Sequence, residues 1–469
     1  MITAGISNEF LARRQSLPSC RNLAMQLGVS RNTVFAAYNR LIEMGILTVK
    51  YKSGYFVSSS AFAASKPKEQ DPTRKPLNFD LASRLSPCLP KPTSLHRIDH
   101  PENWRQYPYP FIYNQIDPDS FPLDQWRECI RLAQNRQKLD FWTSESVLYD
   151  SPDLMQQLRQ RLLNYRGINV SQDQLLITLG VQNALFIVAT LFSGAQRRVG
   201  MENPGYIEGR NAFLSANAEV VNIPVDEHGL KVEAIPERLE LVYTTPSHQF
   251  PTTVTMPTQR RIQLLNASHE QDFLIIEDDY EAETNYVKDR RPTLKSLDRF
   301  DRVIYVGSLS KSLSPGMRLG FMVAHPDIIQ EARSLRRFIL RHPPTLIQDA
   351  VAMFFKLGYH DERLRNIYRN YRLRWREMKA AIDTWLSKLE YQANKGGTCF
   401  WIKGARELNT RKLSETLNSR GVLIDEGSQF FYKGGNKGLN YFRLCFVPVP
   451  IKSIQPGIKI IAEEINKMS

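Results

Sequence analysis

The sequence predicts an α/β protein with a parallel sheet, preceded by a small α+β domain. From about residue 175 to residue 325, apolar runs typical of strands alternate with helical patterns. Such alternation indicates a parallel sheet that is covered by helices on both faces. Residues 1–57 follow another pattern, in which two short helices come before two alternating strands. The chain therefore divides into at least two folding units.

Length, charge and cysteine content narrow the class of protein. With 469 residues and 42% hydrophobic content, the chain can build a large core. Its formal net charge of +14 suits a nucleic-acid partner. The five cysteines are scattered and lack metal-ligand spacing, which indicates a reducing compartment and no metal site. No N-terminal apolar segment and no bilayer-length apolar run exist, so we expect a cytoplasmic protein without a membrane partner.

The N-terminal helical patterns have helix-turn-helix spacing, because two short helices meet at Gly28 within residues 17–45. Their expected apolar faces are Leu23, Ala24 and Leu27 in the first helix, and Val34, Ala37, Tyr38 and Leu41 in the second. Residues 46–57 form two alternating runs around a Lys/Ser/Gly tip, which predicts a β-hairpin wing. Residues 1–57 hold seven Lys/Arg and two acidic residues, a balance of +5 that favours contact with phosphates.

The polar residues that point outward from this module are the expected contacts with double-stranded DNA. They are Ser19, Arg21, Ser30, Arg31, Asn32, Thr33, Arg40 and Lys52. Ser30 is also a good N-cap for the second helix, so capping is the alternative role of Ser30 and Thr33. The two roles are compatible, because helix N-termini often meet phosphates.

A change in composition marks the domain boundary. After Val57 the chain becomes rich in serine and then in proline and lysine, which is typical of a linker. We therefore expect a winged domain at 1–57, a linker at 58–108 and a second domain at 109–469. The second domain has a large part to about residue 340 and a small C-terminal part after it.

One lysine stands in surroundings that suit covalent chemistry. Lys311 follows an apolar strand directly, and Ser308, Ser310 and Arg318 lie close to it in sequence. An amine with a perturbed pKa can form a Schiff base with an aldehyde, and hydroxyls and a guanidinium can hold the phosphate of that aldehyde. The segment therefore points to pyridoxal 5'-phosphate, although a lysine among serines can also be an ordinary surface residue.

Two further segments support the same partner. The strand at 273–277 ends in Asp278 and Tyr280, which can pair with the pyridinium nitrogen and hydrogen-bond the 3-oxygen; a solvated acidic turn is the alternative. A second strand leads through a glycine turn into a helix whose first residues, Val181 and Gln182, can present backbone amides to the phosphate. Tyr206 follows a Pro-Gly turn and can stack on a flat heterocycle.

Taken in order, these segments resemble the fold type I pyridoxal phosphate enzymes, the aspartate aminotransferase superfamily, over about residues 110–465. The resemblance implies large and small domains of that superfamily and a Schiff base on Lys311. It also implies that Arg443, in the strand at 439–446, grips the carboxylate of a substrate or effector; an ordinary strand arginine is the alternative.

The same resemblance extends to two less regular loops. His248 lies in a segment similar to the loop that contacts the cofactor ring, although Thr253 stands where the family usually has glycine. Tyr149 matches a tyrosine that reaches the phosphate of the neighbouring subunit, but the glycine expected shortly after it is missing.

The N-terminal part resembles the winged helix-turn-helix of GntR-type regulators, and the whole order resembles their MocR subfamily. The segment ahead of Leu17 is shorter than the bracing helix usual in GntR-type domains. The resemblance implies a homodimeric transcriptional regulator that binds a promoter site and senses pyridoxal 5'-phosphate, or an amine or amino-acid effector that reacts with it on Lys311. A catalytically active aminotransferase with a vestigial N-terminal module remains the alternative, and a cofactor sensor without an amine effector is a third.

Overall fold

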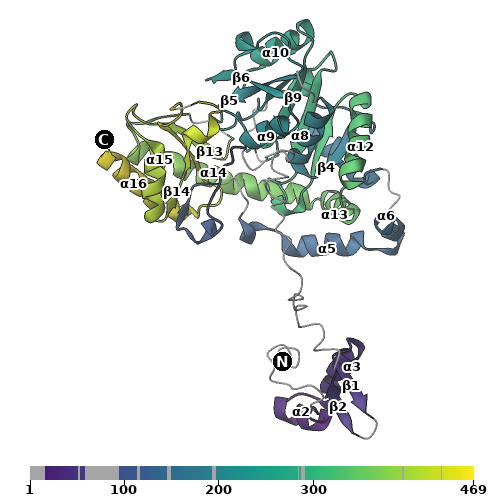
Figure 1. Cartoon of the computed structure of the whole chain (residues 1–469). Coiled ribbons are helices and arrows are strands. Elements are labelled where there is room, and N and C mark those ends of the chain that lie inside the picture. Colours follow the sequence, from purple (N-terminus) through teal and green to yellow (C-terminus); the bar gives the residue numbers. More distant parts are fainter. Residues whose placement is uncertain are drawn as a thin grey trace, which may run out of the picture. The chain divides into compact units, whose positions relative to one another are not determined.

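The structure is a computed structural model that divides the chain into two compact units, Met1–Leu89 and Pro90–Ser469 (Figure 1). It describes residues 16–50, 53–58, 95–112, 117–144, 149–192, 197–283, 285–286, 291–392, 396–434 and 436–468. Within these ranges, no helix has both the length and the apolar character that a membrane crossing requires.

The N-terminal unit is a helix pair beside a two-stranded hairpin, as the sequence predicts. Its elements are α2 (Cys20–Leu27), α3 (Arg31–Glu43), β1 (Leu47–Lys50) and β2 (Gly54–Val57). Gly28 ends α2 with a φ of 65°, which glycine adopts without steric cost. Tyr38 is fully buried between the helices and the hairpin, and its hydroxyl donates a 2.9 Å hydrogen bond to the carbonyl of Pro18.

Two residues of the expected apolar faces do not reach this core. Leu27 is 46% exposed and Ala37 is also exposed. The buried pairs are Cys20 with Ala24 and Val34 with Tyr38, each four residues apart. That spacing centres each buried face on one line of the helix, so Leu27 and Ala37 lie at the margins, where nothing in the described part of this unit covers them.

The C-terminal unit is built on an eight-stranded sheet. The strand order is β4-β11-β10-β9-β8-β5-β6-β7, in which β6, β5, β8, β9 and β10 run parallel, while β11 is antiparallel to both neighbours and β7 is antiparallel to β6. The strands are β4 (Leu175–Thr178), β5 (Arg198–Asn203), β6 (Glu219–Asp226), β7 (Gly229–Leu230), β8 (Leu241–Thr244), β9 (Leu274–Asp279), β10 (Val303–Ser308) and β11 (Gly320–Val323). The expected parallel sheet is confirmed.

Helices cover both faces of this sheet (Figure 1). One face packs on α8 (Gly180–Leu191), α9 (Ile207–Ser215) and α12 (Pro326–Leu340). The other face packs on α5 (Leu123–Ala133), α7 (Pro152–Gln157), the π-helix η6 (Leu158–Leu163), α10 (Thr258–Glu270), α11 (Leu294–Leu297) and α13 (Thr345–Lys356). Because both faces are covered, residues alternate between two buried environments and the strands are apolar throughout, as in β4.

A smaller lobe completes the C-terminal unit. Its sheet has the order β12-β13-β16-β15, and a separate pair joins β3 to β14. The elements are β3 (Tyr109–Pro110), β12 (Glu390–Gln392), β13 (Cys399–Lys403), β14 (Val422–Leu423), β15 (Asp425–Glu426), β16 (Tyr441–Cys445), α15 (Thr410–Ser419) and α16 (Ile451–Met468). The 27-residue helix α14 (Tyr359–Trp385) follows α13 and contributes Ile367, Tyr371 and Met378 to the core of this lobe.

The remaining helices of the C-terminal unit are short. They are α6 (Leu139–Thr143) and the 3-10 helices η3 (Trp104–Gln106), η4 (Pro118–Ser120), η5 (Arg136–Lys138), η7 (Val232–Ala234), η8 (Pro315–Met317) and η9 (Gly427–Phe430).

The C-terminal part of the expected linker, 58–108, packs on the small lobe. Residues 95–108 contact the small lobe: Trp104 is buried against Ile112 and Leu423, and His100 pairs with Asp425. These contacts depend on isolated anchor side chains in a segment without regular periodicity, which composition does not reveal. Residues 59–94 of the expected linker lie outside the described residues.

Candidate functional site

A cavity of about 400 Å³ lies where the parallel strands of the large lobe end and the small lobe begins. This is the edge at which open α/β sheets bind their ligands. Nine of the ten residues predicted for the cofactor line it, and so does Arg443. The nine are Val181, Gln182, Tyr206, Asp278, Tyr280, Ser308, Ser310, Lys311 and Arg318.

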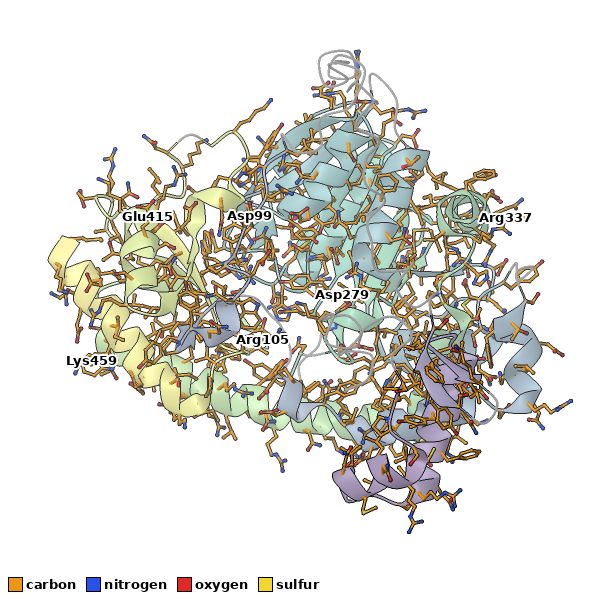
Figure 2. All side chains as sticks on the ribbon, turned by 60° about the horizontal axis from the view of Figure 1, so that its bottom comes forward. Asp99, Arg105, Asp279, Arg337, Glu415 and Lys459 are labelled. Atoms are coloured by element: carbon orange, nitrogen blue, oxygen red, sulfur yellow. The ribbon has the colours of Figure 1, made fainter. Side chains whose placement is uncertain are left out.

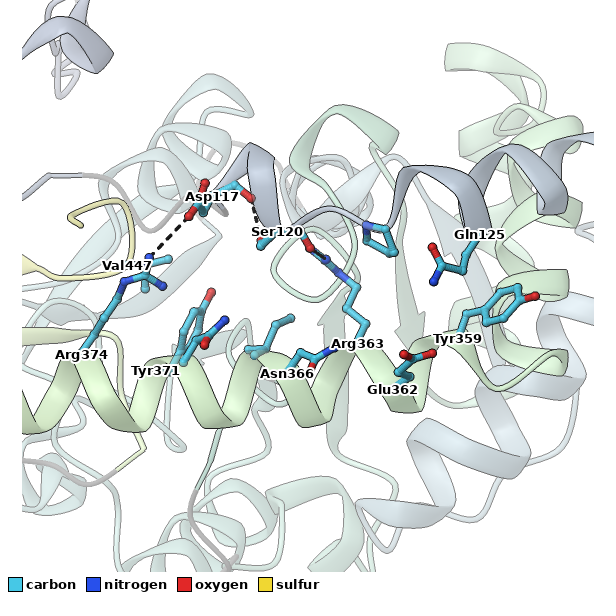
Figure 3. A pocket seen from close by; sticks show the side chains of 13 residues that line it. Asp117, Ser120, Gln125, Tyr359, Glu362, Arg363, Asn366, Tyr371, Arg374 and Val447 are labelled. Carbon is cyan, nitrogen blue, oxygen red and sulfur yellow. Dashed lines mark hydrogen bonds and ion pairs between the residues drawn. The ribbon is translucent and has the colours of Figure 1, made fainter. Parts of the chain in front are cut away.

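Lys311 reaches the cavity from the turn that follows β10. Burial lowers the pKa of its amine, so the neutral, nucleophilic form is available at lower pH than for a lysine in water. Arg363 of α14 anchors this turn, because its guanidinium donates hydrogen bonds to the backbone carbonyls of Ser312 and Leu313. The same guanidinium also donates to the carbonyl of Ser120. Figure 3 shows Arg363 pointing from α14 toward Ser120, beside a smaller cavity of about 80 Å³. The lysine is therefore presented by a firmly anchored turn.

Asp278 stands at the end of β9 with one oxygen satisfied and one not. The hydroxyl of Tyr243 donates to Oδ2 at 2.7 Å, whereas Oδ1 is buried without a hydrogen-bond partner among the described residues. Burial raises the pKa of Asp278 to about 7, although the bond from Tyr243 opposes the rise. A buried carboxylate of this kind calls for a positively charged N–H donor, which a pyridinium ring provides.

The neighbouring Asp279 has a different role. It accepts hydrogen bonds from Arg166 and from the hydroxyl of Tyr305, which lies 2.9 Å away. Burial alone raises the pKa of its carboxyl, but the Arg166 ion pair and these hydrogen bonds lower it below the ordinary value. Figure 2 labels Asp279 in the interior of the C-terminal unit. Oδ1 of Asp279 also has no hydrogen-bond partner among the described residues, but Asp279 is paired with Arg166 and does not line the cavity. Asp278 is the acid that faces the cavity.

The start of α8 forms one part of the cavity wall, where Val181 and Gln182 line it. Gly180 begins the helix with a φ of 78°, and a Cβ at this position would lie 3.3 Å from Nη2 of Arg318. Arg318 donates to the carbonyl of Leu179 at 3.2 Å. A helix N-terminus beside a guanidinium and the hydroxyls of Ser308 and Ser310 forms a cradle for an anion. The donor set fits a phosphate-bearing pyridine aldehyde.

Arg443 of β16 lines the cavity from the small lobe, in an environment that no local sequence pattern predicted. Its Nη1 is 3.9 Å from Oδ2 of Asp425, and its guanidinium lies 4.6 Å from the centre of the Phe250 ring. Asp425 also pairs with Nε2 of His100 at 2.6 Å, and both residues line the cavity. His100 and Asp425 are 325 residues apart in sequence, so no local motif could have identified the pair.

The segment that carries His100 connects the two lobes of the C-terminal unit. His96 contacts the carbonyl of Gln429 at 3.1 Å, and Asn211 of α9 donates to the carbonyl of His96 at 2.8 Å. In Figure 2, Asp99 of this segment lies between the region of Glu415 and that of Asp279. Two residues of this segment, Ile98 and His100, line the cavity.

Two residues carried over from the family are not in the cavity lining. His248 is buried outside the cavity lining, and its Nδ1 lies 3.7 Å from Oε2 of Glu281. Burial lowers the pKa of the His248 imidazole. Tyr149 is 66% exposed, and its ring faces the guanidinium of Arg333. Near His248, Thr253 has a φ of 64°, so the loop follows a left-handed, glycine-like path despite the β-branched side chain.

The expected DNA contacts of the N-terminal unit have two kinds of environment. Ser19 caps α2 and Ser30 caps α3, where its hydroxyl accepts from the amide of Thr33 at 3.1 Å, so the capping role is confirmed. The side chains of Arg21, Arg31, Asn32 and Arg40 are exposed. Lys52 lies outside the described residues.

Comparisons with known proteins agree with this arrangement. The family of class I and II aminotransferases matches residues 122–455, and the gntR family of bacterial regulatory proteins matches residues 1–57. The HTH-type transcriptional regulator TauR of Rhodobacter capsulatus is 38% identical over 99% of this chain and 95% of its own length. The probable rhizopine catabolism regulatory protein MocR of Rhizobium meliloti is 29% identical over 94% of this chain and 87% of its own.

Among solved structures, the kynurenine aminotransferase of Pyrococcus horikoshii, in complex with PMP, superposes with a TM-score of 0.74. It is 26% identical, and the match covers 82% of this chain and 98% of that one. The aminotransferase family and its solved members imply pyridoxal 5'-phosphate as the cofactor. The chain therefore belongs to the MocR-type transcriptional regulators, in which a gntR-family helix-turn-helix domain is joined to a class I and II aminotransferase domain.

Proposed function

We propose that the C-terminal unit of this regulator holds pyridoxal 5'-phosphate at Lys311 and that an amino-acid effector acting at this site changes DNA binding by the N-terminal unit. The observation that carries the proposal is the convergence of Lys311, Asp278 and the Gly180–Arg318 cradle on one cavity. These groups come from three separate strand ends. Each of them suits a different part of the same cofactor.

The residues have distinct tasks in this proposal. The lowered pKa of Lys311 keeps its amine ready for an aldehyde, and Oδ1 of Asp278 accepts a hydrogen bond from a protonated ring nitrogen. Arg318, the hydroxyls of Ser308 and Ser310 and the first amides of α8 hold the phosphate. Tyr206 covers the ring. When bound, the cofactor supplies an electrophilic carbon and an electron-withdrawing ring.

Arg443 is the proposed anchor for the acidic group of the effector. It lines the same cavity as Lys311 from the small lobe, so a molecule with an amine and a carboxylate can engage both lobes at once. A ligand that binds one arrangement of the two lobes better than another shifts the equilibrium between them by that difference in affinity. An amine without a carboxylate lacks the second contact and should have a smaller effect.

The DNA-binding surface is proposed to be the N-terminal end of α3. Arg31 and Asn32 are exposed there, at the helix N-terminus that Ser30 caps, and helix N-termini often meet phosphates. We also propose a homodimer, because a paired operator requires two such helices. The exposed ring of Tyr149 supports a subunit contact at that point.

The alternative function is transamination. It is favoured by the cavity itself, since a lysine, a ring-nitrogen acid and a carboxylate anchor are the groups that such a reaction uses. The two functions make different demands. Regulation requires that the effector binds one conformation more tightly, whereas turnover requires that the transition state is stabilised.

The experiment for cofactor attachment is borohydride reduction followed by peptide mapping of the full-length protein. We expect a visible absorption band before reduction and a phosphopyridoxyl group on the peptide that contains Lys311. Lys311→Ala should show neither, while Lys403→Ala, an exposed lysine of β13, should match the wild type. A wild type without a band at any cofactor concentration would refute the proposal.

A further inference from the structure

Two cysteines lie directly opposite each other in the sheet of the small lobe. Cys399 of β13 and Cys445 of β16 are partners in the antiparallel register. The amide of Phe446 donates to the carbonyl of Thr398 at 3.2 Å, and the amide of Cys445 donates away from the pair, to the carbonyl of Phe111 at 2.8 Å. This pattern identifies Cys399 and Cys445 as a non-hydrogen-bonded pair.

Such a pair has the backbone spacing that a disulfide needs. Non-hydrogen-bonded partners in antiparallel sheets have Cα atoms about 4.5 Å apart and the closer side chains. Disulfides span Cα separations of roughly 4.4–6.8 Å. A bond between Cys399 and Cys445 would therefore require side-chain rotation and little backbone movement, and it would fall at the short, more reducible end of the range.

The two thiols also contact the proposed effector anchor. Nη2 of Arg443 lies 3.3 Å from Sγ of Cys399 and 3.1 Å from Sγ of Cys445. Arg443 is two residues before Cys445 on β16, so both side chains are on the same face of the sheet. Burial raises the pKa of Cys399, but a hydrogen bond with Cys445 and the charge of Arg443 outweigh it and lower the pKa overall. A lower pKa increases the fraction of the thiol that is present as the nucleophilic thiolate at neutral pH.

We propose that Cys399 and Cys445 are a redox modification site, which forms a reversible disulfide with hydrogen peroxide and thereby weakens the hold of Arg443 on an anionic effector. In the first step the Cys399 thiolate attacks peroxide, the O–O bond breaks, and sulfenic acid and water form after protonation of the leaving hydroxide. In the second step the sulfur of Cys445 attacks that of Cys399, the S–O bond breaks, and the thiol proton of Cys445 joins the leaving hydroxide to form a second water. The thiols lose two electrons and the peroxide gains them.

The consequence for Arg443 follows from its remaining contacts. Once the sulfurs bond to each other, Nη2 loses two thiol partners, while Asp425 and the rings of Phe250 and Phe430 remain. The guanidinium is then held at one end only and is less ordered for a carboxylate. This consequence rests on the proposed function; formation of the disulfide does not.

The site is tested by exposing the reduced full-length protein to increasing hydrogen peroxide, alkylating the remaining thiols and mapping peptides without reduction. We expect a Cys399–Cys445 linked peptide that disappears after treatment with dithiothreitol. Cys445→Ser and Cys399→Ala should each abolish it. Cys129→Ala, which removes another buried cysteine in a different core cluster, should leave it unchanged.

An internal marker decides the negative case. Met25 is 72% exposed, so its oxidation reports that peroxide was effective. If both thiols are recovered free at a dose that oxidises Met25, or if Cys399 is oxidised without Cys445, the modification site is refuted.

A second readout separates this inference from the proposed function. In the cofactor-loaded protein, the concentration of L-alanine or 3-aminopropanoate that half-shifts the visible band should rise several-fold on oxidation and return on reduction. Cys445→Ser should remove this redox dependence. A disulfide that forms without any change in the amino-acid titration would refute the proposal that it weakens effector binding by Arg443. If neither amino acid shifts the band of the reduced protein, the proposed function fails with these probes, while the disulfide is judged by mapping alone.

Discussion

Tyr243 donates a 2.7 Å hydrogen bond to Oδ2 of Asp278, and this bond orients the carboxylate of Asp278 at the cavity that Lys311 also lines. Both Tyr243 and Asp278 are buried at neighbouring strand ends, on β8 and β9. The other oxygen, Oδ1, has no hydrogen-bond partner among the described residues. The apoprotein therefore contains a buried acid whose ionisation is costly until a cationic ligand arrives.

The first prediction is that Asp278→Asn stabilises the apoprotein and weakens cofactor binding. Because folding raises the pKa of Asp278 to about 7, the ionised acid destabilises the native state increasingly as pH rises from about 4 to about 7. At pH 8 the variant should therefore be more stable to urea, by up to about 4 kcal/mol, and the difference should shrink at pH 5.5.

The cofactor should respond in the opposite direction. Loss of a charge-assisted hydrogen bond to the ring nitrogen should weaken pyridoxal 5'-phosphate binding by about tenfold or more. Tyr243→Phe removes the orienting bond but retains the carboxylate, and it should have a smaller effect. An Asp278→Asn apoprotein that is less stable than the wild type at pH 8 would contradict the assignment of Asp278 as an unpaired acid.

The second prediction concerns DNA. Arg31→Ala should weaken binding to the promoter site by roughly 1–3 kcal/mol if its guanidinium reads a base in the major groove. If it contacts a phosphate, the salt dependence of binding should instead fall by about one unit of slope. Gel-shift titrations at several salt concentrations distinguish the two. The control is Arg406→Ala, which changes an exposed arginine of the C-terminal unit. If Arg31→Ala and Arg406→Ala gave the same titration curves, Arg31 would not be part of the DNA interface.

The third prediction concerns the effector anchor. In the cofactor-loaded protein, Arg443→Ala should retain the visible band and DNA binding but lose the response to amino acids. The response to a simple amine such as propylamine should persist, because it needs only Lys311 and the cofactor. Arg443→Lys should lie between, since an ammonium group binds a carboxylate without bidentate geometry. Equal losses for both kinds of ligand would argue against Arg443 as the carboxylate anchor.

The fourth prediction concerns Arg363, which donates to the backbone carbonyls of Ser312 and Leu313 beside Lys311 and to that of Ser120 in η4. Arg363→Met leaves the buried carbonyls of Ser312 and Leu313 without this donor, so the C-terminal unit should lose roughly 2–5 kcal/mol of stability in denaturant unfolding. Arg365→Met, an exposed neighbour on α14, should change stability by less than about 0.5 kcal/mol. Comparable effects of the two variants would mean that the hydrogen bonds of Arg363 contribute little to stability.

Local motifs made much of the cofactor end of the cavity predictable. Ser308, Lys311 and Arg318 lie within eleven residues of one another, Asp278 lies at the end of β9, and Gly180 follows β4 closely, so a short stretch of sequence carries each role. In a parallel sheet such strand ends must meet at one edge. The fold class followed from the same alternation of strands and helices.

Long-range pairs were not predictable in this way. His100 meets Asp425, and Cys399 meets Cys445, only because the small lobe fixes a register between distant segments. The scattered positions of the cysteines along the chain did not indicate the cross-strand pair. The packing of Trp104 on the small lobe was unpredictable for the same reason, because it depends on Leu423 of β14.

The central claim is that the aminotransferase domain regulates DNA binding in response to an amine. One preparation of full-length, cofactor-loaded protein should be titrated onto its promoter DNA with and without a panel of α- and ω-amino acids, while keto-product formation is followed in the same samples. We predict a several-fold change in promoter affinity for at least one amino acid, abolished in Lys311→Ala, with far less than about one turnover per second. Sustained turnover at that rate or above, with no sequence-selective DNA binding, would contradict the account and identify the protein as a working aminotransferase.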